Sequence, residues 1–235
     1  MSELLFRPGR VFVAMAPSKP EIRATYERIA ESFAATRVAA WPEVNAFVES
    51  LSRGSRVLDV GSGNGRHAKL LALRGHDAVA FDFSRHLLMI GRNEPRPPAC
   101  AERIAWTEGE ATKLPFHGDS FDAGICVAVL HHLPTDEDRI AALVEIKRVL
   151  RPEARTLVSV WARDQPRFEA VSEAAATGSG DVEVPWTMPD GHQVLRYYHL
   201  FKKGELERLI IECGLHGEKF FRSAGNWFAL ARRDG

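Results

Sequence analysis

A glycine-rich turn between an apolar strand and a helix is the part of this sequence best suited to bind a ligand. Residues 57–60 predict a short buried strand, and the sequence Gly-Ser-Gly-Asn-Gly follows it at residues 61–65. The apolar spacing of a helix begins directly after the turn. Glycines let the backbone approach a ligand closely, and the first amides of a helix attract polar and negative groups. This stretch therefore predicts a cradle for a nucleotide.

The glycine spacing and a nearby acid decide between two classes of cofactor. A dinucleotide site needs G-x-G-x-x-G, which places a pyrophosphate on the helix N-terminus. Here the spacing is G-x-G-x-G, and an acid lies inside the strand two residues before the first glycine. A carboxylate there suits a cationic ligand better than a pyrophosphate, and a plain turn without a ligand is the alternative. The cofactor-binding residues expected here are Asp59, Gly61, Gly63, Asn64 and Gly65.

An acid and a pair of histidines are the next groups placed for chemistry. Asp82 ends a predicted strand at residues 77–82, where a carboxylate can accept hydrogen bonds from both ribose hydroxyls of a nucleoside. Its alternative role is to interact with the dipole of the following helix. His131 and His132 follow an apolar strand at residues 121–129. Because neighbouring side chains at a strand end face opposite ways, we expect at least one histidine in the cleft.

The elements that must hold these residues alternate between strand and helix. This order predicts an α/β fold with a doubly wound sheet, mostly parallel with one antiparallel edge strand, and with ligands at the carboxyl ends of the strands. Helices are expected at residues 20–35, from 42, from 84, from 135 and at 205–213, further strands at 103–108 and 155–161, and a closing antiparallel pair at 218–221 and 227–231.

The chain length suits one domain with additions. We expect the domain at residues 20–235, with a polar, irregular insertion at about 162–195 beside the active-site edge. Residues 1–19 are expected to be a disordered tail, or to precede a true start at Met15, in preference to an organellar presequence.

Composition limits the classes of partner. Lys+Arg and Asp+Glu are 31 each, so any RNA site must be a local patch. The three cysteines are scattered without a C-x-x-C motif, which favours a reducing, cytoplasmic compartment and argues against a metal site. No apolar run approaches the length needed to cross a membrane.

Several motifs outside the glycine turn resemble those of the tRNA wobble-uridine carboxymethyl methyltransferases, a family that includes the methyltransferase domain of AlkB-fused homologues. The glycine spacing with Asp59 itself resembles the first motif of class I S-adenosylmethionine (SAM) methyltransferases. The likeness is collinear over about residues 22–232. Its motifs are Y-x-x-I-A-x-x-F-x-x-T-R-x-x-x-W-P at 26–42, A-V-L-H-H at 128–132, V-W-A at 160–162, V-P-W at 184–186, R-Y-Y-H-L-F-x-x-G-E-L at 196–206 and N-W at 226–227.

The resemblance implies a Rossmann-like fold and SAM-dependent O-methylation of 5-carboxymethyluridine at the tRNA wobble position, with S-adenosylhomocysteine as product. Because a carboxylate is ionised at neutral pH, this reaction needs no strong base. The family pattern implies that Glu110, where relatives usually carry Asp, and Ala111 bind adenine. It also implies the tRNA anticodon loop as a partner and, as in many relatives, a small zinc-binding activator subunit.

The resemblance carries over to five residues as catalytic candidates. It implies that Arg37 and Arg196 bind the carboxylate or a neighbouring phosphate, and that Trp161 and Tyr197 offer stacking surfaces to an unstacked base. His132 would position the reactants. The alternatives are ordinary, since an arginine can cap a helix and aromatic residues can be part of the core.

Two other functions stay open from the residues alone. One is a small-molecule O- or C-methyltransferase acting on a quinone or a carboxylic acid, which the neutral pI would suit. The other is a catalytically silent SAM-binding subunit that supports a partner.

Overall fold

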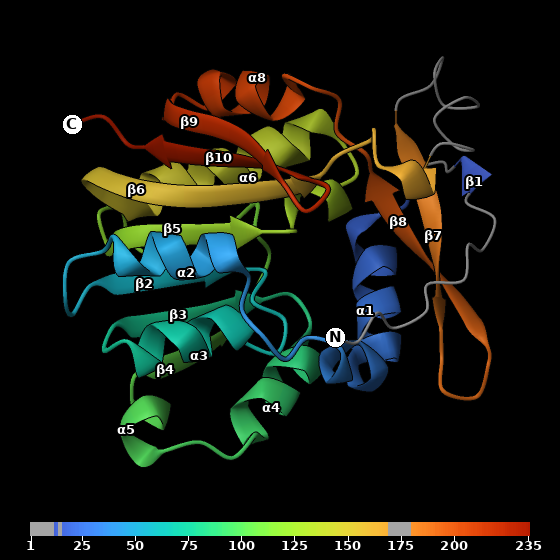
Figure 1. Ribbon diagram of the computed structural model, residues 1–235, viewed down its shortest axis with the longest axis horizontal. Coiled ribbons are helices and arrows are strands. Elements are labelled where there is room, and N and C mark those ends of the chain that lie inside the picture. The colour runs from blue at the N-terminus through green and yellow to red at the C-terminus, as the bar shows by residue number, and fades with distance from the viewer. Residues whose placement is uncertain (1–11, 14–15, 169–179) are drawn as a thin grey trace.

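A large twisted sheet forms the centre of the molecule (Figure 1). The structure is a computed structural model that describes residues 12–13, 16–168 and 180–235. The strands of the large sheet are β2 (Arg56–Val60), β3 (Asp77–Asp82), β4 (Ile104–Glu108), β5 (Phe121–Val127), β6 (Leu150–Trp161), β9 (His216–Ser223) and β10 (Asn226–Arg232).

The strand order is β4-β3-β2-β5-β6-β10-β9. The first five strands in this order run parallel, whereas β10 is antiparallel to both β6 and β9. This confirms a doubly wound, mostly parallel sheet with antiparallel pairing at one edge. The order reverses between β2 and β5, and ligands of such sheets bind at that switch point.

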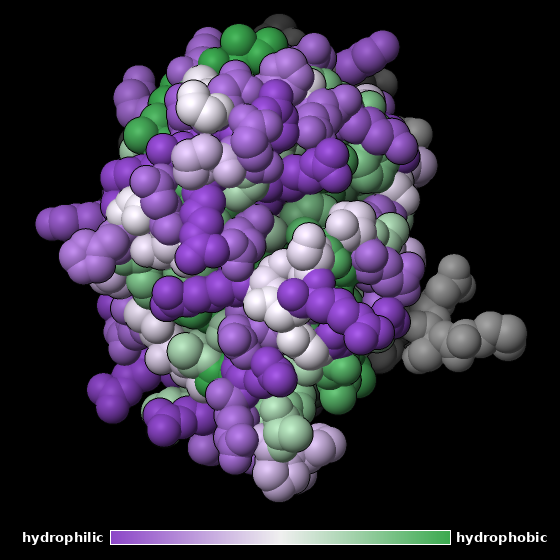
Figure 2. All heavy atoms as spheres, turned by 90° about the vertical axis from the view of Figure 1, so that its left-hand side faces the viewer, coloured by the Kyte–Doolittle hydropathy of each residue, from purple (hydrophilic) through white to green (hydrophobic). Residues whose placement is uncertain are grey.

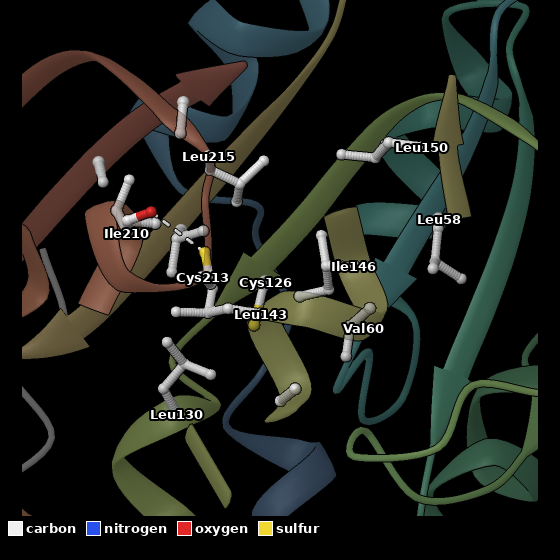
Figure 3. Packing of buried hydrophobic residues seen from close by; sticks show 14 of the residues in the cluster. Leu58, Val60, Cys126, Leu130, Leu143, Ile146, Leu150, Ile210, Cys213 and Leu215 are labelled. Atoms are coloured by element: carbon white, nitrogen blue, oxygen red, sulfur yellow. Dashed lines mark hydrogen bonds between the residues drawn. The ribbon is translucent and has the colours of Figure 1, made fainter. Parts of the chain in front are cut away.

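Helices cover both faces of the large sheet. One core cluster joins Leu58 and Val60 of β2 to Leu143 and Ile146 of α6 (Figure 3). Val57 points to the opposite face, where α2 and α3 pack. The helices are α1 (Lys19–Ala35), α2 (Pro42–Glu49), α3 (Arg66–Leu73), α4 (Arg85–Asn93), α5 (Pro98–Ala101), α6 (Asp136–Val149) and α8 (Glu205–Glu212), with short 3-10 turns at Leu130–His132 and Pro166–Phe168.

Two of the expected helices begin at side-chain caps. The Ser84 hydroxyl accepts a hydrogen bond from the amide of Leu87 at 3.2 Å, and the Thr135 hydroxyl accepts one from the amide of Asp138 at 3.1 Å. Each satisfies an amide that the helix itself leaves unpaired. These caps fix where α4 and α6 begin, and both helices start at the end of the sheet that carries the expected ligand site.

A second, smaller sheet stands with α1 beyond the carboxyl ends of the central strands (Figure 1). Its order is β1-β7-β8, with β1 (Phe12–Val13), β7 (Asp181–Thr187) and β8 (Gln193–His199), all antiparallel. The expected irregular structure is therefore wrong for residues 181–187, because alternating Val182 and Val184 bury one face of a regular hairpin. β1 comes from the predicted tail. The rest of that tail to residue 11, residues 14–15, and residues 169–179 of the insertion lie outside the described residues.

The opposite side of the molecule, at the amino ends of the strands, is mainly hydrophilic (Figure 2). Within the described chain, no helix has the length and apolar character needed to cross a membrane.

Candidate active site

The glycine turn is held in a shape that only glycine adopts easily. Gly61, Gly63 and Gly65 have φ values of 67°, 57° and 72°. A Cβ on Gly61 would lie 2.2 Å from the side chain of Val129 at the end of β5. The amide of Gly61 also donates to the carbonyl of Phe81 in β3 at 2.7 Å. The turn is therefore fixed to both neighbouring strands at once.

Asp82 connects the glycine turn to the next helix. Its Oδ2 accepts from the amide of Gly63 at 2.7 Å, and its Oδ1 accepts from the amide of Ser84 at 2.8 Å. The side chain is almost fully buried, and burial raises the pKa of this carboxyl to about 6. Each oxygen keeps lone pairs that these amides do not use, so Asp82 can still accept from a ligand.

A pocket opens beside Asp82 at the carboxyl ends of the strands, with a volume of about 710 Å³ that is partly open to solvent. Phe81, Phe83 and Leu87 provide apolar walls, as an adenosine group requires. The predicted cofactor residues that line this pocket are Gly61, Gly63, Asp82, Glu110 and Ala111. Five residues from three separate segments of the sequence therefore meet around one cavity that suits SAM.

A second pocket, of about 930 Å³, adjoins the first. The two share Phe33, Gly61, Gly63, Ala128 and His132 in their linings. A group bound at the seam between the pockets is therefore accessible from both. The second pocket is also lined by Arg37, Ser62, Asn64, Arg66, His67, His131, Trp161, Tyr198 and Asn226.

Asp59 differs from its expected position. Its side chain is 1% exposed and is absent from the linings of both pockets. Its Oδ2 instead accepts from the amide of Ala68 in α3 at 3.1 Å, and burial raises the pKa of the carboxyl to about 7. Asp59 therefore joins β2 to α3 beneath the turn. The side chain of Asn64 similarly donates to the carbonyl of Arg37 at 3.2 Å and joins the turn to the end of α1.

His132 lies at the seam with both ring nitrogens engaged. Nδ1 is 3.2 Å from the carbonyl oxygen of Tyr197, which can only accept, so Nδ1 carries the proton. Nε2 then accepts from the hydroxyl of Tyr26, 3.0 Å away on α1. Burial lowers the pKa of His132 to about 3. The ring is therefore neutral and orients Tyr26.

Adjacent tyrosines on β8 face different surroundings. The Tyr198 ring lines the second pocket and stacks on Trp161, with ring centroids 4.1 Å apart and an interplanar angle of 12°. The Tyr197 hydroxyl donates to Asp181 Oδ1 at 2.8 Å, and Tyr197 lines neither pocket. The structure thus places Tyr198, not Tyr197, beside the second pocket. Tyr198 also covers a face of Trp161 that was expected to receive a base.

The two predicted anion-binding arginines are placed differently. Arg37 lines the second pocket, where its guanidinium lies 4.4 Å over the ring of Phe33. Arg196 is only 2% exposed and lines neither pocket, and its Nη1 donates to the Tyr198 hydroxyl at 2.7 Å. Arg196 therefore cannot contact a phosphate of RNA in this conformation, and it reaches the pocket through Tyr198.

Sequence reasoning missed Tyr26, Tyr198 and Arg66 as pocket residues. All three belong to or adjoin the motifs noted above. The direction of Tyr26 and Tyr198 toward the pocket depends on how α1 and β8 pack across the strand ends, and that of Arg66 depends on how β2 meets α3. No local pattern reports that packing.

The two tyrosines make a matched test. We expect Tyr198→Phe to lower kcat/KM about tenfold, because it removes the hydroxyl that accepts a charge-assisted hydrogen bond from Arg196 beside the pocket. We expect Tyr197→Phe to cost about 1–2 kcal/mol of unfolding free energy while the rate changes little, because its hydroxyl serves Asp181. Steady-state kinetics and thermal unfolding of both variants would check this. Equal kinetic losses in the two would contradict the placement.

Comparison with known proteins agrees with this geometry. Residues 58–158 match the family model described as "Methyltransferase domain". A tRNA (carboxymethyluridine(34)-5-O)-methyltransferase of Schizosaccharomyces pombe is 29% identical, over 91% of this chain and 96% of the relative. The alkbh8 protein of the same name from Xenopus tropicalis is 28% identical over 90% of this chain. The chain spans only 40% of that frog protein.

Solved structures share the fold. A SAM-dependent methyltransferase from Methanosarcina mazei superposes with a TM-score of 0.70 at 19% identity, covering 84% of this chain and 99% of that protein. A Haloferax volcanii putative methyltransferase, solved in complex with the Trm112 methyltransferase activator, gives a TM-score of 0.68 at 14% identity, covering 91% and 98%. At these identities the likeness concerns the fold.

Proposed function

Because this chain belongs to the SAM-dependent tRNA carboxymethyluridine methyltransferase family, we propose that it esterifies the carboxylate of 5-carboxymethyluridine at the wobble position of tRNA. The observation that carries the proposal is the second pocket. Its lining includes Arg37 and Tyr198, together with His132, which it shares with the cofactor pocket. A cation and a polar hydroxyl at that place suit an anionic methyl acceptor.

The proposed roles follow from the linings of the two pockets. Asp82 accepts from the ribose hydroxyls, while Glu110 and Ala111 lie beside the adenine. Bound SAM supplies an electrophilic methyl group on its sulfonium. Arg37 and Tyr198 hold the substrate carboxylate in line with that methyl group, and Arg196 orients the Tyr198 hydroxyl.

The remaining candidates shape the site. His132 and Tyr26 close the seam, and Trp161 supports Tyr198 by stacking. No residue has to remove a proton, because the carboxylate is already ionised at neutral pH. The work of the protein is therefore to orient the two reactants and to exclude water.

The product tests the proposal. Purified chain is incubated with methyl-labelled SAM and with tRNA from cells that lack the native activity. The expected label is on an ester, which mild alkali cleaves to release methanol. A label that survives alkali sits on nitrogen, carbon or an ether oxygen and contradicts carboxylate methylation. Labelling of free small acids without RNA would instead identify a small-molecule enzyme. SAM binding without any turnover would identify a silent subunit.

The rate at saturating SAM should be nearly flat from about pH 7.5 to 9, above the pKa values of about 6 and 7 of the Asp82 and Asp59 carboxyls. A substrate carboxylate stays ionised above about pH 5, and His132, with a pKa of about 3, stays neutral throughout this range. We also expect His132→Asn, which keeps a donor, to retain more activity than His132→Ala. Single-turnover rates from about pH 6 to 9 would check both points. A fall in rate with one ionisation near pH 6–7 that is present in wild type and absent in His132→Asn would show that His132 acts as a base, whereas the same fall in both proteins would be that of the buried carboxyls of Asp82 and Asp59.

Binding of tRNA should rest on a small cluster of charges, because the chain is neutral overall. Lys202 and Lys203 are exposed just after β8. Changing both to Glu should weaken tRNA binding, and the salt dependence for wild type should reflect only a few phosphates. Filter binding at several salt concentrations would measure both. An unchanged affinity, or a steep salt dependence, would place the RNA site elsewhere.

The proposal also covers the cellular compartment and a protein partner. Cys100, Cys126 and Cys213 are buried free thiols, which suits a cytoplasmic location. We further propose that a small zinc-binding activator subunit assembles with this chain, as the Haloferax volcanii complex shows for a protein of the same fold. Co-expression of the chain with such a subunit, followed by gel filtration and assay of the complex, would test the assembly.

A further inference from the structure

Three arginines gather at the second pocket without carboxylate partners. Arg37 and Arg66 line it, and Arg196 lies directly behind Tyr198. Among the described residues, no carboxylate oxygen lies within 4.0 Å of any of the three guanidinium groups. Asp59 is the nearby acid, but it is engaged with the amide of Ala68. The protein therefore holds three cations together without an ion pair at contact distance, and the buried Asp59 offsets only part of the charge of Arg66 from farther away.

Aromatic rings and neutral oxygens hold these arginines in place. Arg66 lies 5.4 Å over the ring of Trp41, and its Nη1 is 3.5 Å from the carbonyl of Ala39. Arg37 similarly lies over Phe33. Stacking supports the flat face of a guanidinium and leaves most of its N–H groups free at the edge. Arg37 and Arg66 can therefore each donate to an anion.

Arg37 occupies the middle of the three. Burial, followed by the charge of Arg37, lowers the pKa of Arg66 to about 10. Burial also lowers the pKa of Arg37, and the charge of Arg196 contributes to that shift. Arg37 thus lies close enough to both other arginines for the charges to act on one another. Like charges held together in this way favour the binding of anions between them.

A buried histidine adds a second observation at the Arg66 end. His67 is 3% exposed and lines the same pocket, and its Nε2 has no hydrogen-bond partner in the described structure. Its Nδ1 faces Asp59 Oδ1 at 3.9 Å. Ser62 lines this end as well, and its buried hydroxyl also lacks a partner. Unsatisfied polar groups that surround a pocket indicate a ligand that satisfies them.

The reaction brings two carboxylates to this place. One belongs to the methionyl part of SAM. With its adenosine in the first pocket, SAM would extend along the glycine turn that both pockets share. The other belongs to the substrate. We propose that the SAM α-carboxylate binds between Arg66 and Arg37, with His67 and Ser62 beside it, and that the substrate carboxylate binds between Arg37 and Tyr198. The second assignment rests on the proposed function, whereas the first needs only SAM.

SAM and decarboxylated SAM, which differ only in the α-carboxylate, test the first assignment. Calorimetry should show that wild type binds SAM more tightly than the decarboxylated analogue. Arg66→Gln should weaken SAM binding about tenfold or more and leave the analogue nearly unaffected. Arg66→Lys, which keeps the charge, should retain part of the preference and serves if the Gln variant does not fold. Equal losses for both ligands, or no loss for either, would overturn the assignment.

Arg74→Gln is the matched control, since Arg74 ends the same helix, is exposed and pairs with Glu49. It should leave both affinities unchanged. The middle position of Arg37 is tested separately. Arg37→Gln should reduce the preference for SAM over its analogue and also raise the KM for tRNA, whereas Arg66→Gln should leave the KM for tRNA at saturating SAM unchanged. If Arg37→Gln alters only one of the two quantities, Arg37 does not serve both carboxylates. The calorimetry with SAM and its analogue uses no tRNA, so its result is independent of the test of the esterified product.

Discussion

Replacing Asp82 by alanine is expected to weaken SAM binding by about 2–3 kcal/mol, which is roughly a 30- to 150-fold rise in Kd. The carboxylate is the acceptor for two ribose hydroxyls in the proposed complex. It also accepts from the amides of Gly63 and Ser84, so its removal leaves two buried donors unpaired and loosens the glycine turn. Isothermal titration calorimetry with a folded variant measures the loss.

Two further variants make the Asp82 test specific. Asp82→Asn keeps the shape and one acceptor oxygen, so its affinity should fall between wild type and alanine. Asp77 lies at the other end of the same strand, where it is exposed and pairs with Arg103. Asp77→Ala should therefore leave SAM binding unchanged. An unchanged Kd in a folded Asp82→Ala protein would show that SAM binds elsewhere.

Replacing Arg37 by lysine is expected to lower kcat/KM for tRNA about 10- to 100-fold, although the charge is kept. A guanidinium can donate two parallel hydrogen bonds to a carboxylate, and an ammonium acts only as a point charge. Lysine also loses the planar stacking on Phe33 that fixes the direction of Arg37. Initial rates at varied tRNA concentration and saturating SAM would measure the effect.

Arg28→Lys provides the control for Arg37, because Arg28 is exposed on the same helix. Its rate should match that of wild type. If Arg37→Lys retains the full rate, Arg37 does not orient the substrate carboxylate. That result would leave the assignment to the methyltransferase fold intact, since the fold does not depend on the shape of this side chain.

Much of the site's framework could be predicted from local patterns. The glycine turn, the acid at the end of β3 and the helix caps at Ser84 and Thr135 all depend on residues within a few positions of one another. Turn and cap preferences are properties of the backbone itself, so short sequences report them well. The alternation of strands and helices then predicted the parallel sheet and the edge at which ligands bind.

Side-chain direction was much less accessible to sequence analysis. The motif at residues 196–206 contains two adjacent tyrosines, and nothing in it shows which one faces the pocket. A strand alternates its faces, so an error of one residue exchanges a pocket residue for a structural one. The β7–β8 hairpin was missed for a related reason, because its alternating pattern is short and its buried face packs on distant elements.

The sequence by itself determined the class of fold, the glycine turn and the likeness to a methyltransferase family, because these depend on local spacing and on the order of motifs. Only the tertiary structure decided which groups meet around the substrate. It turned Asp59 and Arg196 away from the pockets and brought Tyr26, Arg66 and Tyr198 into contact with them. The placement of Tyr26, Arg196 and Tyr198 depends on how α1 and β8 pack against the ends of the central strands, whereas that of Asp59 and Arg66 depends on how β2 meets α3. The contacts at the strand ends join residues more than a hundred positions apart, as between Tyr26 and His132, and no local pattern in the chain encodes them.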